Sequence, residues 1–208
     1  MVKYVCKIEF VDLFVGKVPS NPEALVHVVR KRVKEGVLPV ETNVEAEALR
    51  EAYEVLQRAE MVNTFYSDEK GLYIKGFDII GMIKERMRQL GITRKKRGYV
   101  SAVEGLRIEP WKIHLKRHDG SYVKKPDGQI AKPIITDRPW LRGVITIADY
   151  VKPPVILEFT IIKEDQVIPE KEFENILKSC HRLGGLRKEY GEFKWVKIKN
   201  NPKQQDVT

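Results

Sequence analysis

The most constraining part of this sequence is its C-terminal quarter, where segments with two different hydrophobic periods follow one another. Residues Val155–Lys163 are β-branched and aromatic, which is typical of a buried strand. A helix is predicted from Pro169 to Cys180, because proline is favoured in a first helical turn. Its apolar face would consist of Phe173, Ile176, Leu177 and Cys180. Residues Phe193–Ile198 read as another strand, so the order strand, helix, strand predicts an α+β fold.

A glycine-rich basic loop, His181–Gly191, joins this helix to the last strand. Glycine allows positive φ angles or a close approach of backbone, and the loop contains Gly184, Gly185 and Gly191. Basic and aromatic residues lie among them: Arg182, Arg187, Lys188 and Tyr190. One interpretation is a backbone laid against phosphate, and the other is a helix cap and tight turn with solvated charges. The sequence leaves both open.

The positive charge of the chain favours an anionic partner. The 208 residues include 38 Lys and Arg against 29 Asp and Glu, which gives a net charge of +9. Nucleic acid is the most frequent partner of such proteins. The charge is concentrated between Lys84 and Lys132, where 14 basic residues stand against 5 acidic ones.

Several other classes of protein are not indicated by the sequence. The two cysteines, Cys6 and Cys180, lie in apolar patterns that favour buried thiols over a disulfide or a metal site. No signal peptide or membrane-length apolar run is recognisable, so we expect a cytoplasmic protein with no membrane partner. No HExxH, CxxC, Walker or GxGxxG motif occurs, and no metal or cofactor is expected.

The first third of the chain is predicted to hold a strand and two helices. Residues Val2–Val15 alternate as in a strand. Two capping boxes, Ser-x-x-Glu and Thr-x-x-Glu, begin predicted helices over about residues 20–35 and 42–60. The polar segment 63–70 is expected to be a loop. We interpret the cations of the first helix as a solvated face: Arg30, Lys31, Arg32 and Lys34.

A further helix is predicted from Phe77 to Leu90, directly after Gly71–Gly76. A glycine before a helix lets an anion approach the N-terminal amides, where the helix dipole favours negative charge. Asp78 would partly occupy that position, and a core helix with a glycine-containing turn is the alternative. Its flanks would carry Lys84, Arg86 and Arg88.

Residues Gly98–Pro133 are predicted to form basic β-hairpins. The cluster Arg94–Arg97 precedes them, and Asp119-Gly120 and Asp127-Gly128 are hairpin-turn signals. Aromatic residues alternate with cations here, as in surfaces on which bases stack and phosphates pair with basic side chains. The alternative is that Trp111 belongs to the core and that the charges serve solubility.

We therefore predict a nucleic-acid interface built from cations and three aromatic residues that stack on bases. Its members are Lys84, Arg94, Lys95, Lys96, Arg97, Tyr99, Trp111, Lys112, Lys116, Arg117, Lys124, Lys125, Arg182, Arg187, Lys188 and Tyr190. No catalytic residue is assigned.

Two other functions remain open from the sequence. His114 and His118 would share one face of a strand. Beside Lys116, Arg117 and Tyr99 they could form a metal-independent endoribonuclease, in which one imidazole takes the 2′-hydroxyl proton and the other protonates the leaving oxygen. Two solvated histidines on a hairpin are the simpler interpretation. The third function is that of a phage structural or protein-interaction protein whose basic region meets an acidic surface.

Three segments resemble the RAMP superfamily of CRISPR effector proteins: Phe14–Gly16, Leu72–Gly76 and Leu183–Gly191. The second is similar to the IPGSSLKG segment of the family, although the Ser-Ser pair is absent. No aspartate follows Gly16 where RNA-cleaving members carry one. The chain also resembles a group of phage-encoded proteins in three features: Lys75-Gly76-Phe77, Arg138-Pro139 and the ending from Arg187 to Phe193.

The resemblance implies a single α+β domain over residues 1–208 with a ferredoxin-like or RNA-recognition-motif-like core, single or doubled. The basic hairpins would be an insertion around residues 94–135. It also implies binding of single-stranded RNA, or of DNA as the second choice, without cleavage. The protein would self-associate or join a ribonucleoprotein or filament in the cytoplasm of a prokaryotic or phage-infected cell.

Overall fold

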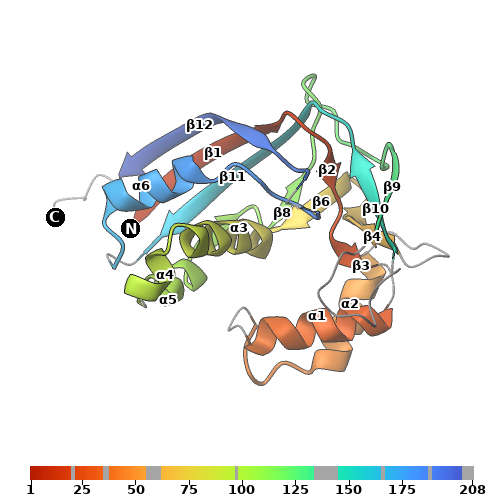
Figure 1. The fold of residues 1–208 in the computed structure, drawn as a ribbon, viewed down its shortest axis with the longest axis horizontal. Helices are drawn as coiled ribbons and strands as arrows, with labels where there is room; N and C mark the ends of the chain where they lie inside the picture. Colours follow the sequence, from red (N-terminus) through yellow and green to blue (C-terminus); the bar gives the residue numbers. More distant parts are fainter. Residues whose placement is uncertain are drawn as a thin grey trace.

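The computed structural model describes residues 1–19, 22–34, 38–54, 62–96, 98–133, 145–164, 167–186 and 189–202. Over these ranges the chain is a mixed α+β fold with three sheets (Figure 1). Neighbouring strands are antiparallel, apart from one short parallel pairing. The predicted α+β class is confirmed.

The main core lies against a four-stranded sheet. In spatial order its strands are β12 (Phe193–Pro202), β1 (Val2–Phe10), β11 (Val155–Lys163) and β7 (Arg107–Glu109). Every second residue of β1 from Tyr4 to Phe10 is buried, which is the period of a strand with one face in the core. The predicted strands at both ends of the chain therefore pair with each other.

Two helices connect the strands of this sheet. Numbered along the chain, the four strands lie in the order 4-1-3-2. Helix α3 (Gly76–Gln89) lies between the first and second, and α6 (Glu170–Ser179) lies between the third and fourth. In the core, Phe173 of α6 contacts Tyr4 of β1, with ring centroids 5.2 Å apart. The result is one β-α-β-β-α-β unit, and a doubled core is not shown within the described ranges.

Two smaller sheets and a helical pair are inserted into this unit. One sheet contains β2 (Phe14–Val15), β10 (Ile145–Val151), β4 (Val62–Thr64) and β3 (Val18–Pro19), with β9 (Gly128–Pro133) paired to β10. The other contains β5 (Tyr66–Asp68), β6 (Gly71–Lys75) and β8 (Lys112–His114). Helices α1 (Pro22–Lys34) and α2 (Val44–Glu54) lie below them in Figure 1. They share a second, small core with Tyr66 and Tyr73.

The predicted insertion of basic hairpins around residues 94–135 is wrong over most of its length. Residues Gly98–Glu104 form helix α5, because three apolar side chains with helical spacing are buried: Tyr99, Ala102 and Val103. Strands β7, β8 and β9 pair with β11, β6 and β10, and not with one another. Only the turn between Lys116 and Tyr122 forms a local hairpin, as predicted.

Two further predictions are corrected by long-range pairing. The segment 63–70 is not a loop, because it contributes residues to β4 and all of β5, and Thr64, Phe65 and Tyr66 are buried. The last strand continues past Ile198 to Pro202, since β1 pairs with it along its whole length. The predicted helix segments at residues 20–21, 35 and 55–60 lie outside the described residues.

The glycine-rich loop after α6 is packed against the N-terminal segment. The N–H of Gly185 donates to the carbonyl of Val15 at 2.8 Å, and that of Gly191 donates to the carbonyl of Leu13 at 3.0 Å. Gly184 has a φ of +105°, in the left-handed region that favours glycine. The described part of this loop therefore makes a tight turn, while Arg187 and Lys188 lie outside the described residues.

Substitution of Gly184 by alanine is expected to lower the free energy of unfolding by about 1–3 kcal/mol. A Cβ at this position would lie 2.8 Å from the carbonyl oxygen of Val15 and 2.8 Å from the ring of Phe14. Urea denaturation monitored by circular dichroism measures the change. The control is Gly105→Ala, whose Cβ would make ordinary contacts at 3.7 Å and is expected to change stability by less than about 1 kcal/mol. Equal stability of the two variants would contradict tight packing of the loop.

Candidate functional site

A basic groove runs between α1 and α3. It has a volume of about 330 Å³, and a single carboxylate, Glu85, belongs to its lining. The cations that line it are Lys17, Lys31, Arg32, Lys84 and Arg88. We call this cavity the α1–α3 groove. Its excess of positive charge makes it attractive to an anion.

Helical periodicity explains why these cations share one cavity. Lys84 and Arg88 are four residues apart and therefore lie on the same side of α3. On α1, Lys31 and Arg32 follow Val28 by three and four residues, and all three line the groove. The cations of α1 that the sequence suggested were a solvated face thus include two that face α3 across the cavity.

The two α3 cations also have carboxylate neighbours. The Nζ of Lys84 lies 2.6 Å from Glu104, and Arg88 lies 3.8 Å from Glu85. The pair of Arg88 is exposed, and such pairs contribute about 0–1 kcal/mol. Arg88 can therefore exchange its carboxylate for a phosphate at small cost, whereas the pair of Lys84 is more enclosed.

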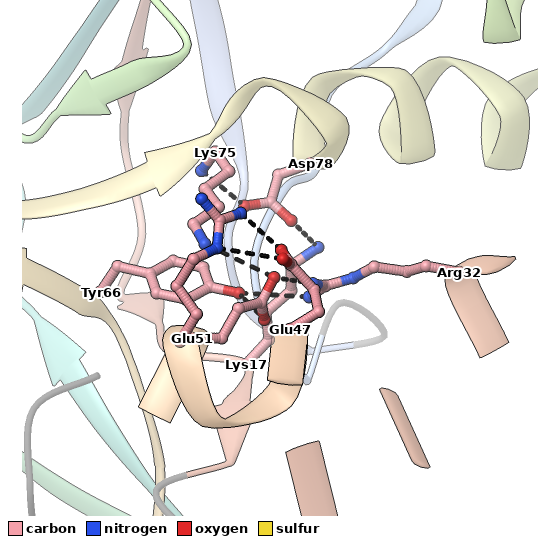
Figure 2. Close-up of polar contacts among 8 residues, drawn as sticks. Lys17, Arg32, Glu47, Glu51, Tyr66, Lys75 and Asp78 are labelled. Atoms are coloured by element: carbon pink, nitrogen blue, oxygen red, sulfur yellow. Dashed lines mark hydrogen bonds and ion pairs between the residues drawn. The ribbon is translucent and has the colours of Figure 1, made fainter. Parts of the chain in front are cut away.

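Two cations that line the groove, Lys17 and Arg32, belong to a group of mostly buried polar side chains (Figure 2). Arg32 donates through Nη1 to Glu51 and through Nη2 to the hydroxyl of Tyr66, the latter at 3.2 Å. Tyr66 in turn donates to the second oxygen of Glu51 at 2.9 Å. These side chains come from α1, α2 and β5, so they join the helical pair to the sheets.

Lys75, Asp78 and Lys17 complete this group on the side of α3. The Nζ of Lys75 lies 3.5 Å from Glu51 and 4.1 Å from the ring centroid of Tyr66. Asp78 accepts the backbone N–H of Lys75 at 3.1 Å, and its other oxygen pairs with Lys17. Asp78 thus occupies the N-terminal end of α3, as the sequence suggested. We call these six residues, Lys17, Arg32, Glu51, Tyr66, Lys75 and Asp78, the buried charge network.

The surroundings shift the pKa of two members of this network, Tyr66 and Arg32. Burial raises the pKa of Tyr66 well above its ordinary value, so the hydroxyl stays neutral. Burial alone would lower the pKa of Arg32, but Tyr66 and Glu51 raise it above its ordinary value. Arg32 also stacks on Phe77, with Cζ 3.9 Å from the ring centroid, which holds the guanidinium beside the groove.

The predicted interface residues are dispersed over the structure. Of those that the structure describes, only Lys84 lines the α1–α3 groove. Most others contact acidic residues: Lys96 with Glu172 at 2.8 Å, Lys116 with Glu158 at 2.8 Å, Arg117 with Asp127 at 2.9 Å, Lys112 with Asp68 at 3.6 Å, Arg182 with Glu192 at 3.7 Å, and Lys124 with the carbonyl of Glu69 at 2.6 Å. Three predicted cations are exposed and make no ion pair with another described residue: Arg94 and Lys95 of α4 (Ile92–Lys95), and Lys125. Arg97, Arg187 and Lys188 lie outside the described residues.

The predicted stacking residues differ in how much of the ring is free. Trp111 is 48% exposed, so it is not a core residue, and it meets Phe77 of the groove lining edge-on, with centroids 5.9 Å apart. Tyr99 is buried and donates to Glu172 at 2.8 Å. Tyr190 is half-buried, with the Nζ of Lys132 lying 5.5 Å from its ring centroid.

The two histidines of the alternative ribonuclease have separate partners. His114 lies 2.9 Å from Asp68, and its side chain is 13% exposed. His118 lies 3.5 Å from Glu9 and is largely exposed. Burial of Asp68 would raise its pKa, but the hydrogen bond and charge of His114 lower it below its ordinary value. The described contacts therefore place each imidazole beside its own carboxylate.

The described residues contain neither a metal-binding cluster nor a membrane helix. No group of three or more His, Cys, Asp or Glu in these ranges is arranged to hold a metal ion. No helix in the same ranges is long and apolar enough to cross a bilayer. Cys6 and Cys180 are buried free thiols, as predicted, and burial raises the pKa of each to about 12.

Neutralising Glu51 by Glu51→Gln is expected to lower the free energy of unfolding by about 3–5 kcal/mol. The reason is that Arg32 and Lys75 would stay buried without their shared carboxylate. Chemical denaturation measures the loss. The matched control is Glu45→Gln, because Glu45 of the same helix pairs with Arg30 through side chains that are 72% and 49% exposed. Its loss is expected to cost less than about 1 kcal/mol. A loss no larger than the control would show that the network adds nothing to the fold.

Comparisons with known proteins give a likeness to solved structures and no match in sequence. No protein-family model matches the sequence, and no curated protein matches it. A solved structure described as a CRISPR protein from Archaeoglobus fulgidus is similar, with a TM-score of 0.41 and 11% sequence identity. The alignment covers 97% of this chain and 65% of that chain. The present chain thus spans about two thirds of the length of that archaeal protein.

Proposed function

We propose that this protein binds single-stranded nucleic acid in the α1–α3 groove, RNA in preference to DNA. The observation that carries the proposal is the lining of the groove, with five cations and one carboxylate. Phosphate oxygens are the natural partners of lysine and arginine side chains arranged in this way. Sequence-independent affinity for a polyanion follows from the release of its counterions.

The shape of the groove favours one strand over a duplex. Its volume of about 330 Å³ is near the lower end of the range for ligand sites, about 300–1,000 Å³. Such a space suits the backbone of one strand, whereas a duplex holds its two backbones on opposite sides of stacked base pairs. Trp111 is exposed next to Phe77 at the side of the groove and offers a ring for an unpaired base.

The preference for RNA and the biological setting rest on resemblance. The strand order 4-1-3-2 with two connecting helices is that of ferredoxin-like folds, to which RNA-recognition motifs belong. Leu72–Gly76, the segment that resembles the RAMP superfamily, is followed directly by α3 and includes Lys75 of the buried charge network. These features support a binding subunit of a ribonucleoprotein or filament in a prokaryotic or phage-infected cell.

The predicted cations outside the groove extend this proposal. Arg94, Lys95 and Lys125 are exposed and make no ion pair with another described residue, so they are available to a longer strand. The cations around β8 lie among several carboxylates. An open cavity beside His114 is lined by three lysines and three carboxylates, and its formal charge is balanced.

Fluorescence anisotropy of a labelled single-stranded RNA tests the proposal. Wild-type affinity is expected to fall steeply with salt. The double variant Lys84→Gln/Arg88→Gln removes two groove cations and is expected to weaken binding roughly ten- to hundredfold, with a log-log salt slope lower by about two units. A DNA oligomer of the same sequence measures the preference for RNA.

The matched comparison is Arg94→Gln/Lys95→Gln, which removes the same charge from an exposed helix outside the groove. A smaller loss of affinity is expected for this pair. Equal losses in the two double variants would mean diffuse attraction to the basic surface, and would contradict the groove as the binding site. Wild-type protein that binds neither RNA nor DNA at low salt would overturn the proposed function altogether.

A further inference from the structure

We infer that the end of the α1–α3 groove at Lys17 and Arg32 is a phosphate subsite, and that a phosphate bound there fastens the helical pair α1–α2 to the core. The inference deepens the proposed function and rests on it for the nature of the natural ligand. The subsite lies where the groove, which is open to solvent, meets the buried charge network, whose carboxylates are enclosed.

The first argument is that cations outnumber carboxylates among the six residues of the network. It contains three cations, Lys17, Arg32 and Lys75, and two carboxylates, Glu51 and Asp78. Tyr66 stays neutral, as its raised pKa requires. Counted over these six side chains, the cations exceed the carboxylates by one. An anion supplied from outside would meet this excess of positive charge.

The second argument is that only cations of the network reach the groove. Lys17 and Arg32 belong to the lining of the groove, whereas Glu51 and Asp78 do not. The carboxylates are almost completely enclosed, with side chains 3% and 1% exposed, and the side chain of Lys17 is 35% exposed. A ligand entering here meets positive charge first, and the repelling carboxylates lie behind it.

The third argument concerns what such a phosphate would connect. Arg32 belongs to α1, and Lys17 lies between β2 and β3. Arg32 is tied to Glu51 of α2, and Lys17 is tied to Asp78 of α3 (Figure 2). A phosphate shared by the two cations would bridge the helical pair and the core unit. Binding should therefore stabilise the folded protein, because a ligand that binds only the native state raises its melting temperature.

Thermal unfolding in sodium pyrophosphate, compared with sodium chloride at equal ionic strength, tests this subsite without a nucleic acid. Pyrophosphate is expected to raise the melting temperature of the wild type by about 2–4 °C. Lys95→Met, which removes an exposed lysine outside the groove, should keep the full shift. Lys17→Met/Asp78→Asn should lose the shift and bind the RNA oligomer about tenfold more weakly. The double change is used because Lys17→Met alone would leave a buried carboxylate unpaired, and the replacement amide can still accept the N–H of Lys75.

The single variant Asp78→Asn gives an expectation of opposite sign. It removes one carboxylate and releases Lys17, so the affinity for pyrophosphate is expected to rise roughly two- to fivefold. A simple loss of fold integrity would move both Asp78 variants in the same direction. An increase in one and a loss in the other is specific to the charge balance.

Several outcomes separate this inference from the proposed function. No pyrophosphate shift in the wild type, or a shift that survives Lys17→Met/Asp78→Asn, overturns the subsite. The proposed function would still stand if Lys84→Gln/Arg88→Gln weakened RNA binding. If the wild type bound no RNA and yet showed a shift that depends on Lys17, the subsite would stand for a smaller phosphate-containing ligand, and the proposed function would fail.

Discussion

The arrangement of this protein depends on one buried ionic contact, between Arg32 of α1 and Glu51 of α2, which also engages Tyr66 and Lys75. The apolar core of the helical pair is much smaller than the main core, so polar contacts carry much of its attachment to the sheets. Breaking a buried pair by removing one partner is strongly destabilising. Because this contact fixes α1 opposite α3, the groove exists, and the cations of both helices act on the same space.

Local periodicity was enough to predict the β-α-β-β-α-β core in part. Strand β1, strand β11 and helix α6 each carry a regular apolar pattern of their own type, and their order along the chain is simple. The prediction of a hairpin strand failed at 98–104, because the three buried residues of this segment have helical spacing and do not alternate as in a strand. The local pattern also failed at β4 and β5, whose polar composition suggested a loop, because pairing with distant strands overrides local preference.

The candidate site was harder to predict than the fold, since its parts are brought together by long-range contacts. The density of positive charge in the sequence indicated Lys84, which lines the groove. It also indicated cations outside the groove, such as Lys96 and Lys116, which pair with carboxylates. Arg32 was overlooked because its partners Glu51 and Tyr66 lie 19 and 34 residues away in the chain. One signal was present: Leu25, Val29 and Arg32 follow at helical spacing, so Arg32 shares the side of α1 that faces the small core.

The measurement that tests the central claim most directly is hydrogen–deuterium exchange with and without a saturating single-stranded RNA. Binding in the groove predicts slower exchange of amides in α1 and α3, and in the β2–β3 segment that carries Lys17. The backbone amides of the residues that line the open cavity beside His114 should exchange at an unchanged rate. Protection confined to β8 and the hairpin after it, with α1 and α3 unaffected, would contradict the account and place the strand on the surface that charge density alone suggested.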